Sequence, residues 1–267
     1  MGQGIAKSRF LRRLVGVSLL ILFHGVPCHA DEVFTVSRAT ETVKMDFKGF
    51  YADRENLVRL GIGLAGAGII ANTSIDRDLQ DRYQADLRSG DTDHGSKVFK
   101  VFGVAYVAAP VYLGAYGAAR MLRNPTMEEW AQKSARATVL GVPAVLGLMA
   151  ALGADRPTDR GESHWEPFRG WHGVSGHAFI GGVPFITGAM MAENVYVKAA
   201  LYGASTLTGL SRINDDKHFF SQAALGWYLA FLSSSVVEKG KDSQEGRLHF
   251  AVSPVPNGWA VTARKIF

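Results

Sequence analysis

Six long apolar segments, rich in alanine, glycine and leucine, limit the folds that this sequence can adopt. They cover residues 56–75, 98–122, 127–153, 174–193, 195–210 and 218–237. Each is longer than a typical β-strand and lacks the alternation of polar and apolar residues that a half-buried strand needs, so helix is favoured over strand. We therefore expect an all-α fold, a six-helix bundle that occupies residues 56–237.

The stretches on either side of this expected bundle differ from it in composition. Residues 31–55 form a polar N-terminal lead-in, and residues 238–267 form a tail. Two β-compatible runs in the tail, residues 248–253 and 259–265, are separated by a turn that contains Asn257 and Gly258. Because Asn-Gly is a strong signal for a tight turn between strands, the tail is predicted to form a small β-hairpin.

The first 30 residues have the pattern of an export signal. A basic stretch is followed by the apolar residues 14–23 and by the small residues Cys28 and Ala30, which resemble a cleavage site. We expect an exported protein, periplasmic or in the inner membrane with its active site facing the periplasm; an uncleaved signal anchor is the alternative. Cys28 is the single cysteine, so the cleaved chain would have no disulfide, cysteine nucleophile or cysteine-bound metal.

Net charge and hydropathy limit the classes of partner that this chain is expected to bind. The chain has a formal charge of +5, but four of its 29 basic residues lie in the first 30 positions, which hold no acid. The rest is nearly neutral, so no nucleic-acid partner is expected. The mean hydropathy is only +0.04, yet residues 101–119 carry no charge. Membrane association, with five or six spans, and a tight soluble bundle both remain open.

Three connections between the apolar segments carry unusual polar residues. They contain, in chain order, Arg156-Pro157, then Ser175-Gly176-His177, then Ser211-Arg212 followed by His218. Antiparallel helices joined by short loops place alternate loops at the same end of a bundle. We therefore expect two arginines and two histidines to meet in one pocket.

This set of residues suits a phosphate group. Arg156 and Arg212 can each form paired hydrogen bonds to phosphate oxygens. Ser175 is a good N-cap, and the backbone N–H groups that follow it, at Gly176 and at the next residue, attract an anion at a helix start. Two imidazoles that titrate near neutral pH can provide a nucleophile and a general acid.

In this order the three motifs resemble the signature of the type 2 phosphatidic acid phosphatase superfamily, which includes bacterial class A acid phosphatases and vanadium haloperoxidases. The resemblance covers residues 149–222 closely. It implies that His218 attacks phosphorus and forms a phosphohistidine, and that His177 protonates the leaving group. It also implies a phosphate site without metal or cofactor, formed by Arg156, Ser175, Gly176 and Arg212.

Two positions depart from the family pattern. Met149 stands where a lysine is usual, and Gln222 stands where an aspartate is usual. Gln222 lies four residues after His218, so on a helix it can still reach the imidazole and orient it. The neighbouring Asp215 and Asp216 are expected to form an N-cap for the sixth segment.

The leading function is therefore an exported phosphatase that acts on a phosphomonoester or a lipid pyrophosphate, a lipid being favoured. A vanadium haloperoxidase, and a degenerate phosphate- or lipid-binding membrane protein, are the alternatives. Trp165, Phe168 and Trp171 are candidates for a lipid-accepting mouth or simple loop residues.

A zinc cluster is the alternative to a metal-free phosphate site. Its candidate ligands are Glu162, His164, His172 and His177. The interval of five between the last two does not place two ligands on one helical face, so zinc is disfavoured. The sequence does not determine the oligomeric state.

Overall fold

The computed structural model describes residues 36–159, 161–242, 248–255 and 258–265. The predicted export signal, with Cys28, lies outside the described residues. The chain divides into two compact units between Met45 and Asp46. The described part of the first unit is the beginning of helix α2 (Val36–Tyr51), and the second unit contains all the other elements.

Helices make up most of the second unit. In chain order they are α3 (Arg54–Ala71), α4 (Ile75–Arg82), the π-helix η1 (Tyr83–Leu87), α5 (Gly90–Phe99), the 3₁₀-helix η2 (Lys100–Gly103), α6 (Ala105–Leu122), α7 (Pro125–Leu152), the 3₁₀-helix η3 (Pro157–Asp159), α8 (Gly176–Met191), α9 (Val195–Asn214) and α10 (Phe220–Asp242). The all-α prediction is confirmed for this bundle.

The predicted count of six helices is wrong, because the described residues contain nine α-helices. The six expected segments correspond to α3 and α6–α10. The additional helices α2, α4 and α5 are short or polar, so a search for long apolar segments passes over them. Tertiary contacts rather than apolar length stabilise such helices.

Side-chain caps explain where the central helices begin. Asn124 caps α7, where Pro125 occupies the first turn, and its side chain accepts a hydrogen bond from the Met127 N–H group. Asn194 caps α9 in the same way, and Ser175 caps α8. These residues satisfy backbone N–H groups that have no partner inside their own helix.

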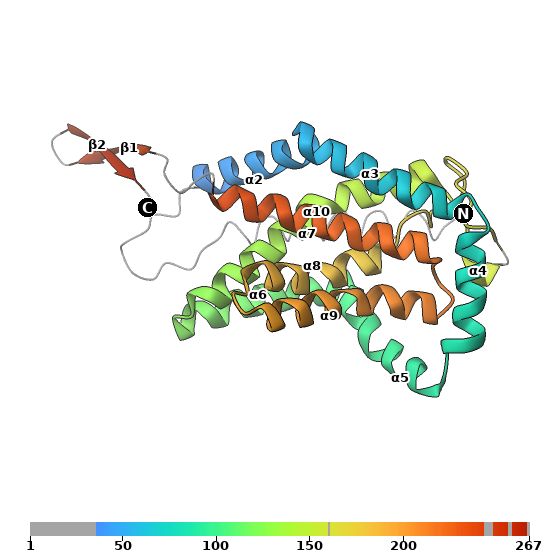
Figure 1. The fold of residues 1–267 in the computed structure, drawn as a ribbon. Helices are drawn as coiled ribbons and strands as arrows, with labels where there is room; N and C mark the ends of the chain where they lie inside the picture. The colour runs from blue at the N-terminus through green and yellow to red at the C-terminus, as the bar shows by residue number, and fades with distance from the viewer. Residues whose placement is uncertain (1–35, 160, 243–247, 256–257, 266–267) are drawn as a thin grey trace, which may run out of the picture. The chain divides into compact units, whose positions relative to one another are not determined.

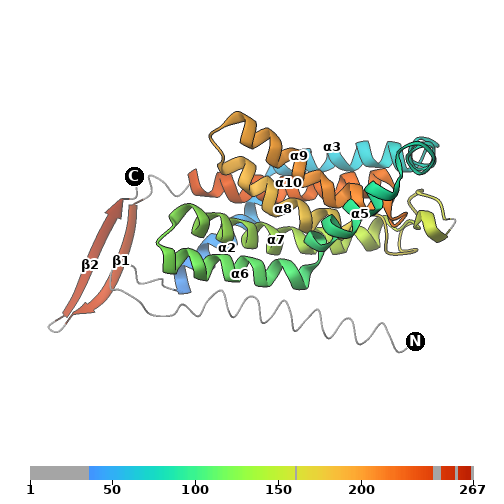
Figure 2. The ribbon, with the colours of Figure 1, turned by 90° about the horizontal axis from the view of Figure 1, so that it is seen from below.

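The hydrophobic core lies between α7, α8 and α10. Phe179 of α8, Leu140 of α7 and Leu229 of α10 are almost completely buried there. Figure 1 shows α10 running along α7 and α8, and Figure 2 shows α6 beside α7. This packing holds the ends of α7, α8, α9 and α10 in fixed relative positions.

Arg136 of α7 forms an ion pair with Asp46 of α2. The guanidinium donates two hydrogen bonds to the carboxylate, Nε to Oδ2 at 2.9 Å and Nη2 to Oδ1 at 2.8 Å. Asp46 is almost fully buried, with 4% of its surface exposed. The pair therefore satisfies a charge that would be costly to bury alone.

The described tail contains two strands, β1 (Leu248–Val255) and β2 (Gly258–Lys265). They pair antiparallel with each other, from Leu248 opposite Lys265 to Val255 opposite Gly258. The turn residues 256–257 between them lie outside the described residues.

Among the described residues, one helix, Pro125–Leu152, is long and apolar enough to cross a membrane. The number rises to three if two bent helix pairs each count as one span, namely Arg54–Ala71 with Ile75–Leu87 and Gly90–Gly103 with Ala105–Leu122. The five or six spans that the apolar segments left open exceed this number; α8, for example, has only 16 residues, fewer than a bilayer crossing requires.

Candidate active site

The three polar motifs meet where α9 ends and α10 begins. Arg156 follows α7, Ser175 precedes α8, and Arg212 lies in the last turn of α9. His218 lies in the short connection to α10. Figure 1 shows α4 and α5 crossing the same end of the bundle. The expectation that alternate loops gather at one end agrees with this arrangement.

Gln222, in the first turn of α10, links the three motifs. Its side-chain Oε1 lies 2.9 Å from Nδ1 of His218 and accepts the Phe219 N–H group at 3.2 Å. Its Nε2 donates to the carbonyl oxygen of Asp155 at 2.9 Å, and its own carbonyl accepts the Ser175 N–H group at 2.9 Å. One fully buried residue therefore links the nucleophile candidate to both other motifs, to Asp155 through its side chain and to Ser175 through its backbone.

These bonds also assign the proton on His218. The Phe219 N–H group can only donate, so the amide oxygen of Gln222 must face it, and the Asp155 carbonyl can only accept, so the amide nitrogen must face that. The atom of Gln222 that faces Nδ1 of His218 is therefore an acceptor. Nδ1 carries the proton, and Nε2 keeps its lone pair.

Two buried guanidinium groups contribute unused donors. The Nε atoms of Arg156 and Arg212 are both buried without a hydrogen-bond partner in the part of the chain that the structure describes. Arg212 is held through its Nη1, which donates to Asp215 Oδ2 at 3.1 Å. A buried donor without a partner costs about 1–3 kcal/mol, and an anion with several oxygens would satisfy both.

The start of α8 provides a third set of donors. Ser175 Oγ accepts the Ala178 N–H group at 3.3 Å and caps the helix. A Cβ added at Gly176 would meet no heavy atom of the described residues within 4 Å, so the space beside this backbone is open. At Gly226 of α10, in contrast, an added Cβ would lie 2.2 Å from the Ser175 carbonyl. Gly226 thus permits the close approach of α10 to the cap.

Both imidazoles are held in the neutral form. Burial, with the positive charges of Arg212 and Arg156, lowers the pKa of His177 to about 4. Burial also lowers the pKa of His218 to about 3, against the opposing hydrogen bond from Gln222. The pKa of Arg212 is lowered by burial as well. The site therefore has a net positive potential that a bound anion would relieve.

Three further residues that the sequence analysis singled out, at positions 149, 215 and 216, have structural contacts. Met149 packs against the apolar core. Asp215 and Asp216 do not cap α10, which corrects the prediction. Asp215 instead binds Arg212, and Asp216 accepts a hydrogen bond from Gln80 Nε2 at 2.7 Å.

The structure does not assemble the alternative zinc cluster. His164 lies 4.0 Å from Glu162 at an exposed position, while the ring of His172 meets that of His218, with centroids 6.1 Å apart. Within the described ranges, no group of three or more histidine, cysteine or acidic side chains is placed to hold a metal ion.

Sequence reasoning missed two contributors to this site. One is the Asp155 carbonyl, which is a backbone group and leaves no mark in a residue pattern. The other is His172, whose ring lies against His218. The spacing of His172 from His177 suggested only a metal-ligand role. A contact between His172 and His218, 46 positions later in the chain, leaves no mark in the spacing of residues.

The region that carries these motifs is similar to a known family. A model described as the PAP2 superfamily matches residues 128–240, a region that includes all three motifs and Gln222. No curated protein and no solved structure matched the chain.

Proposed function

We propose that this chain hydrolyses a phosphomonoester or the terminal phosphate of a lipid pyrophosphate without a metal ion. The match of residues 128–240 to a model described as the PAP2 superfamily supports this, since members of that superfamily generally act as phosphatases on phosphoesters. The observation that carries the proposal is the pair of buried guanidinium Nε atoms, on Arg156 and Arg212, that lack a partner in the described part of the chain. They share their pocket with two neutral imidazoles.

In the first step, the lone pair on Nε2 of His218 attacks phosphorus. The N–P bond forms as the bond between phosphorus and the leaving oxygen breaks, and His177 gives its proton to that oxygen. Gln222 Oε1 accepts the hydrogen bond from the Nδ1–H group of His218 throughout, and the proton stays on Nδ1. Arg156, Arg212 and the start of α8 at Ser175 and Gly176 hold the three remaining phosphate oxygens.

In the second step, water attacks the phosphohistidine. His177, now neutral, takes a proton from the water as the new oxygen–phosphorus bond forms and the N–P bond breaks. Inorganic phosphate leaves, and His218 returns to its initial state. His177 is thereby left protonated, as it was when the substrate bound, and it loses this proton when the phosphate leaves, so the complete cycle consumes only the ester and water.

The low pKa of His177 is consistent with its role as an acid. In the empty site its pKa is about 4, because burial and two arginines oppose a further positive charge. A bound phosphate dianion offsets the arginine charges and favours the imidazolium. His177 therefore gains its catalytic proton together with the substrate.

A lipid substrate is supported by the loop between Arg156 and Ser175. Phe168 and Trp171 in this loop are 83% and 59% exposed, and large apolar groups beside a phosphate pocket suit a substrate with an acyl or isoprenoid chain. From the pattern of residues 1–30 we propose export, to the periplasm or to the inner membrane with the site facing the periplasm.

The test is phosphate release by the purified mature protein from lipid and water-soluble phosphate esters, with and without EDTA. We expect turnover that EDTA leaves unchanged, and an acid-labile phosphoenzyme trapped by rapid quench. His218→Ala should abolish both while Asp78→Asn, an exposed change on α4, leaves both intact. Activity lost in EDTA and restored by zinc or magnesium would refute the metal-independent mechanism, and halide oxidation dependent on vanadate would favour the haloperoxidase.

A further inference from the structure

Asp76, in the first turn of α4, is a buried acid that the proposed mechanism does not use. Its side chain has 0% exposure. Oδ1 accepts the backbone N–H group of Ser221 at 3.0 Å, and Oδ2 accepts the Ser221 hydroxyl at 2.5 Å. A carboxylate from outside the matched region 128–240 therefore binds the chain three residues after His218.

This contact determines how α10 begins. Ser221 is the second residue of α10, where backbone N–H groups have no partner inside the helix. The expected cap from Asp215 and Asp216 does not exist, and the N–H groups of Phe219 and Ser221 bond to Gln222 and Asp76 instead. The negative charge also suits the positive end of the helix dipole.

The same turn of α4 contacts the loop that follows α7. The Arg77 guanidinium lies 5.1 Å from the centroid of the Phe219 ring, and its Nη2 donates to the Gly161 carbonyl. Arg77 also pairs with Glu162 at 3.3 Å. One helical turn thus contacts the residue next to the nucleophile and the loop that carries Arg156.

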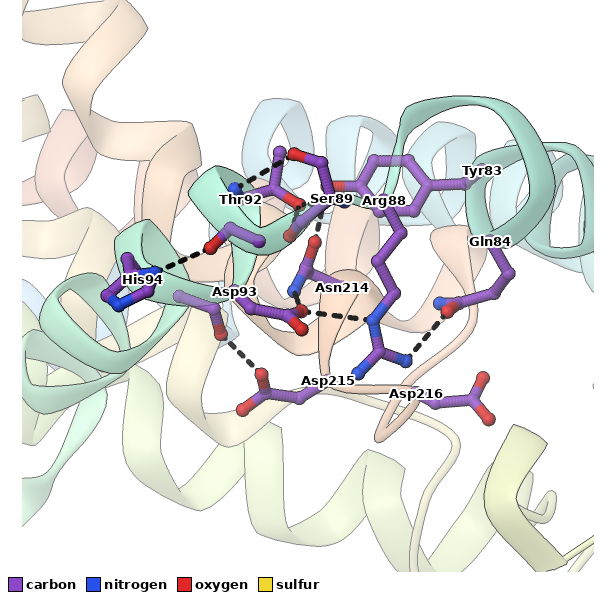
Figure 3. A network of polar contacts seen from close by, with 12 residues as sticks. Tyr83, Gln84, Arg88, Ser89, Thr92, Asp93, His94, Asn214, Asp215 and Asp216 are labelled. Atoms are coloured by element: carbon purple, nitrogen blue, oxygen red, sulfur yellow. Dashed lines mark hydrogen bonds and ion pairs between the residues drawn. The ribbon is translucent and has the colours of Figure 1, made fainter.

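Further along, the segment from α4 to α5 binds the last residues of α9, just before the connection to α10. Gln84 Nε2 donates to the Ile213 carbonyl at 2.9 Å. Figure 3 shows Asn214 between these elements, where its Nδ2 donates to Asp93 Oδ1 at 2.7 Å. Asp93 is in turn held by Arg88 at 3.0 Å. The end of α9, from which the connection that carries His218 leaves, is therefore held from outside the matched region 128–240.

We propose that Asp76 is a positioning residue for the nucleophile: by holding the first turn of α10 through Ser221, it fixes Gln222 and so the direction in which Nε2 of His218 points. This inference rests on the proposed function for its kinetic consequence. The structural part of it, the alignment of the His218–Gln222 hydrogen bond, can be tested without turnover.

The variants separate positioning from general stability. Asp76→Ala removes both hydrogen bonds, Asp76→Asn keeps an acceptor for the Ser221 N–H group, and Ser221→Ala removes only the hydroxyl contact. Asp78→Asn is the matched control, because Asp78 lies exposed on the same helix. Each protein is assayed below its own melting temperature, which is measured first.

In the kinetic arm we expect kcat to fall by about tenfold in Asp76→Asn and about 100-fold in Asp76→Ala, since a misplaced reacting group can cost that much. Ser221→Ala should lie between wild type and Asp76→Asn. KM and competitive inhibition by sulfate should change by less than about threefold, because the anion donors are untouched. A uniform loss of melting temperature with unchanged kcat in the folded protein would overturn the proposal.

In the spectroscopic arm, the Nδ1 proton of His218 is observed by ¹⁵N-edited NMR and assigned by its loss in His218→Ala. We expect the hydrogen-bonded signal in wild type and Asp78→Asn, and its shift or broadening in Asp76→Asn. An unchanged signal in both Asp76 variants would refute the positioning role. If wild type releases no phosphate from any ester, the proposed function fails, and this arm alone decides the role of Asp76.

Discussion

Two arginines, both partly buried on helices of the same bundle, are treated differently by the structure. Arg136 donates from Nε and Nη2 to the single carboxylate of Asp46. Arg212 donates from Nη1 to Asp215, but its Nε is buried without a partner among the described residues. The guanidinium of Arg136 therefore has its hydrogen-bond acceptor within the protein, whereas that of Arg212 has one N–H donor, at Nε, available to a ligand.

The difference separates a structural ion pair from a binding site. A buried donor that lacks a partner lowers stability, so a fold gains nothing from it unless another molecule supplies the acceptor. Arg156 shows the same feature, and its charge helps to lower the pKa of Arg212. We therefore expect substitutions at Arg212 to affect activity and substitutions at Arg136 to affect stability.

The sharpest test of this contrast is the same substitution at both positions. Arg212→Lys replaces a planar fork by a single charged point. Each lost charge-assisted hydrogen bond should cost about 1.5–3 kcal/mol, or about 10- to 100-fold in kcat/KM. Phosphate release under saturating and limiting substrate measures the loss. A change below about threefold would remove Arg212 from the phosphate site.

Arg136→Lys should give the opposite pattern. One of the two hydrogen bonds to the buried Asp46 is lost, so the free energy of unfolding should fall by about 1–3 kcal/mol. In the folded protein kcat/KM should stay within about twofold of wild type. Denaturant unfolding followed by circular dichroism measures the first effect. If Arg136→Lys reduced turnover as much as Arg212→Lys, the contrast between the two arginines would be invalid.

Gln222 refines the comparison, because it lies in the active site yet has all its hydrogen bonds satisfied within the protein. Gln222→Leu removes the acceptor for Nδ1 of His218, and Gln222→Glu keeps it. Both variants lose the donor to Asp155. We expect kcat in Gln222→Glu to exceed that in Gln222→Leu by about tenfold, because the retained acceptor keeps the imidazole in its reactive tautomer and orientation.

Rapid-quench measurement of phosphoenzyme formation tests this, since it isolates the step in which His218 attacks. Equal rates in the two variants would mean that some other group orients the histidine. Melting temperatures of both variants serve as the control for the shared loss of the Asp155 contact.

The sequence was sufficient for what local chemistry determines. The interval of four residues predicted the contact between Gln222 and His218, although His218 precedes α10 and the contact is made across the helix start rather than along a helix. The start of α8 follows from the cap at Ser175. The helical fold was predictable from the length of the apolar segments, and the match to the PAP2 superfamily model over residues 128–240 covers the three ordered motifs.

What the sequence could not give depends on contacts between distant residues. Asp76 binds Ser221 across 145 positions of the chain, and no spacing rule marks such a pair. Helix α4 is only 8 residues long and strongly polar, so its existence depends on the elements it contacts. The expected cap at Asp215 and Asp216 was wrong because both acids have other partners: Asp215 binds Arg212, three residues away, and Asp216 binds Gln80, which is distant in the chain.

The smallest expected effect is the proton uptake that accompanies anion binding at the site. Sulfate is a suitable probe, because its charge stays constant across the working range. In the empty site the pKa values of His177 and His218 are about 4 and about 3, held down by burial and by Arg156 and Arg212. Bound sulfate offsets the arginine charges and raises the pKa of the nearby imidazoles, so the complex binds more protons than the free protein.

By linkage, sulfate should then bind more tightly as the pH falls from 7.5 towards 5, by about three- to tenfold. Calorimetry in two buffers with different ionisation enthalpies measures both the affinity and the proton uptake. His177→Gln should flatten the pH dependence, whereas Arg212→Lys should weaken binding at every pH. Sulfate affinity that is independent of pH, without proton uptake, would show that the unpaired arginine donors do not bring an anion next to the histidines, and the contrast between Arg136 and Arg212 would lose its chemical meaning.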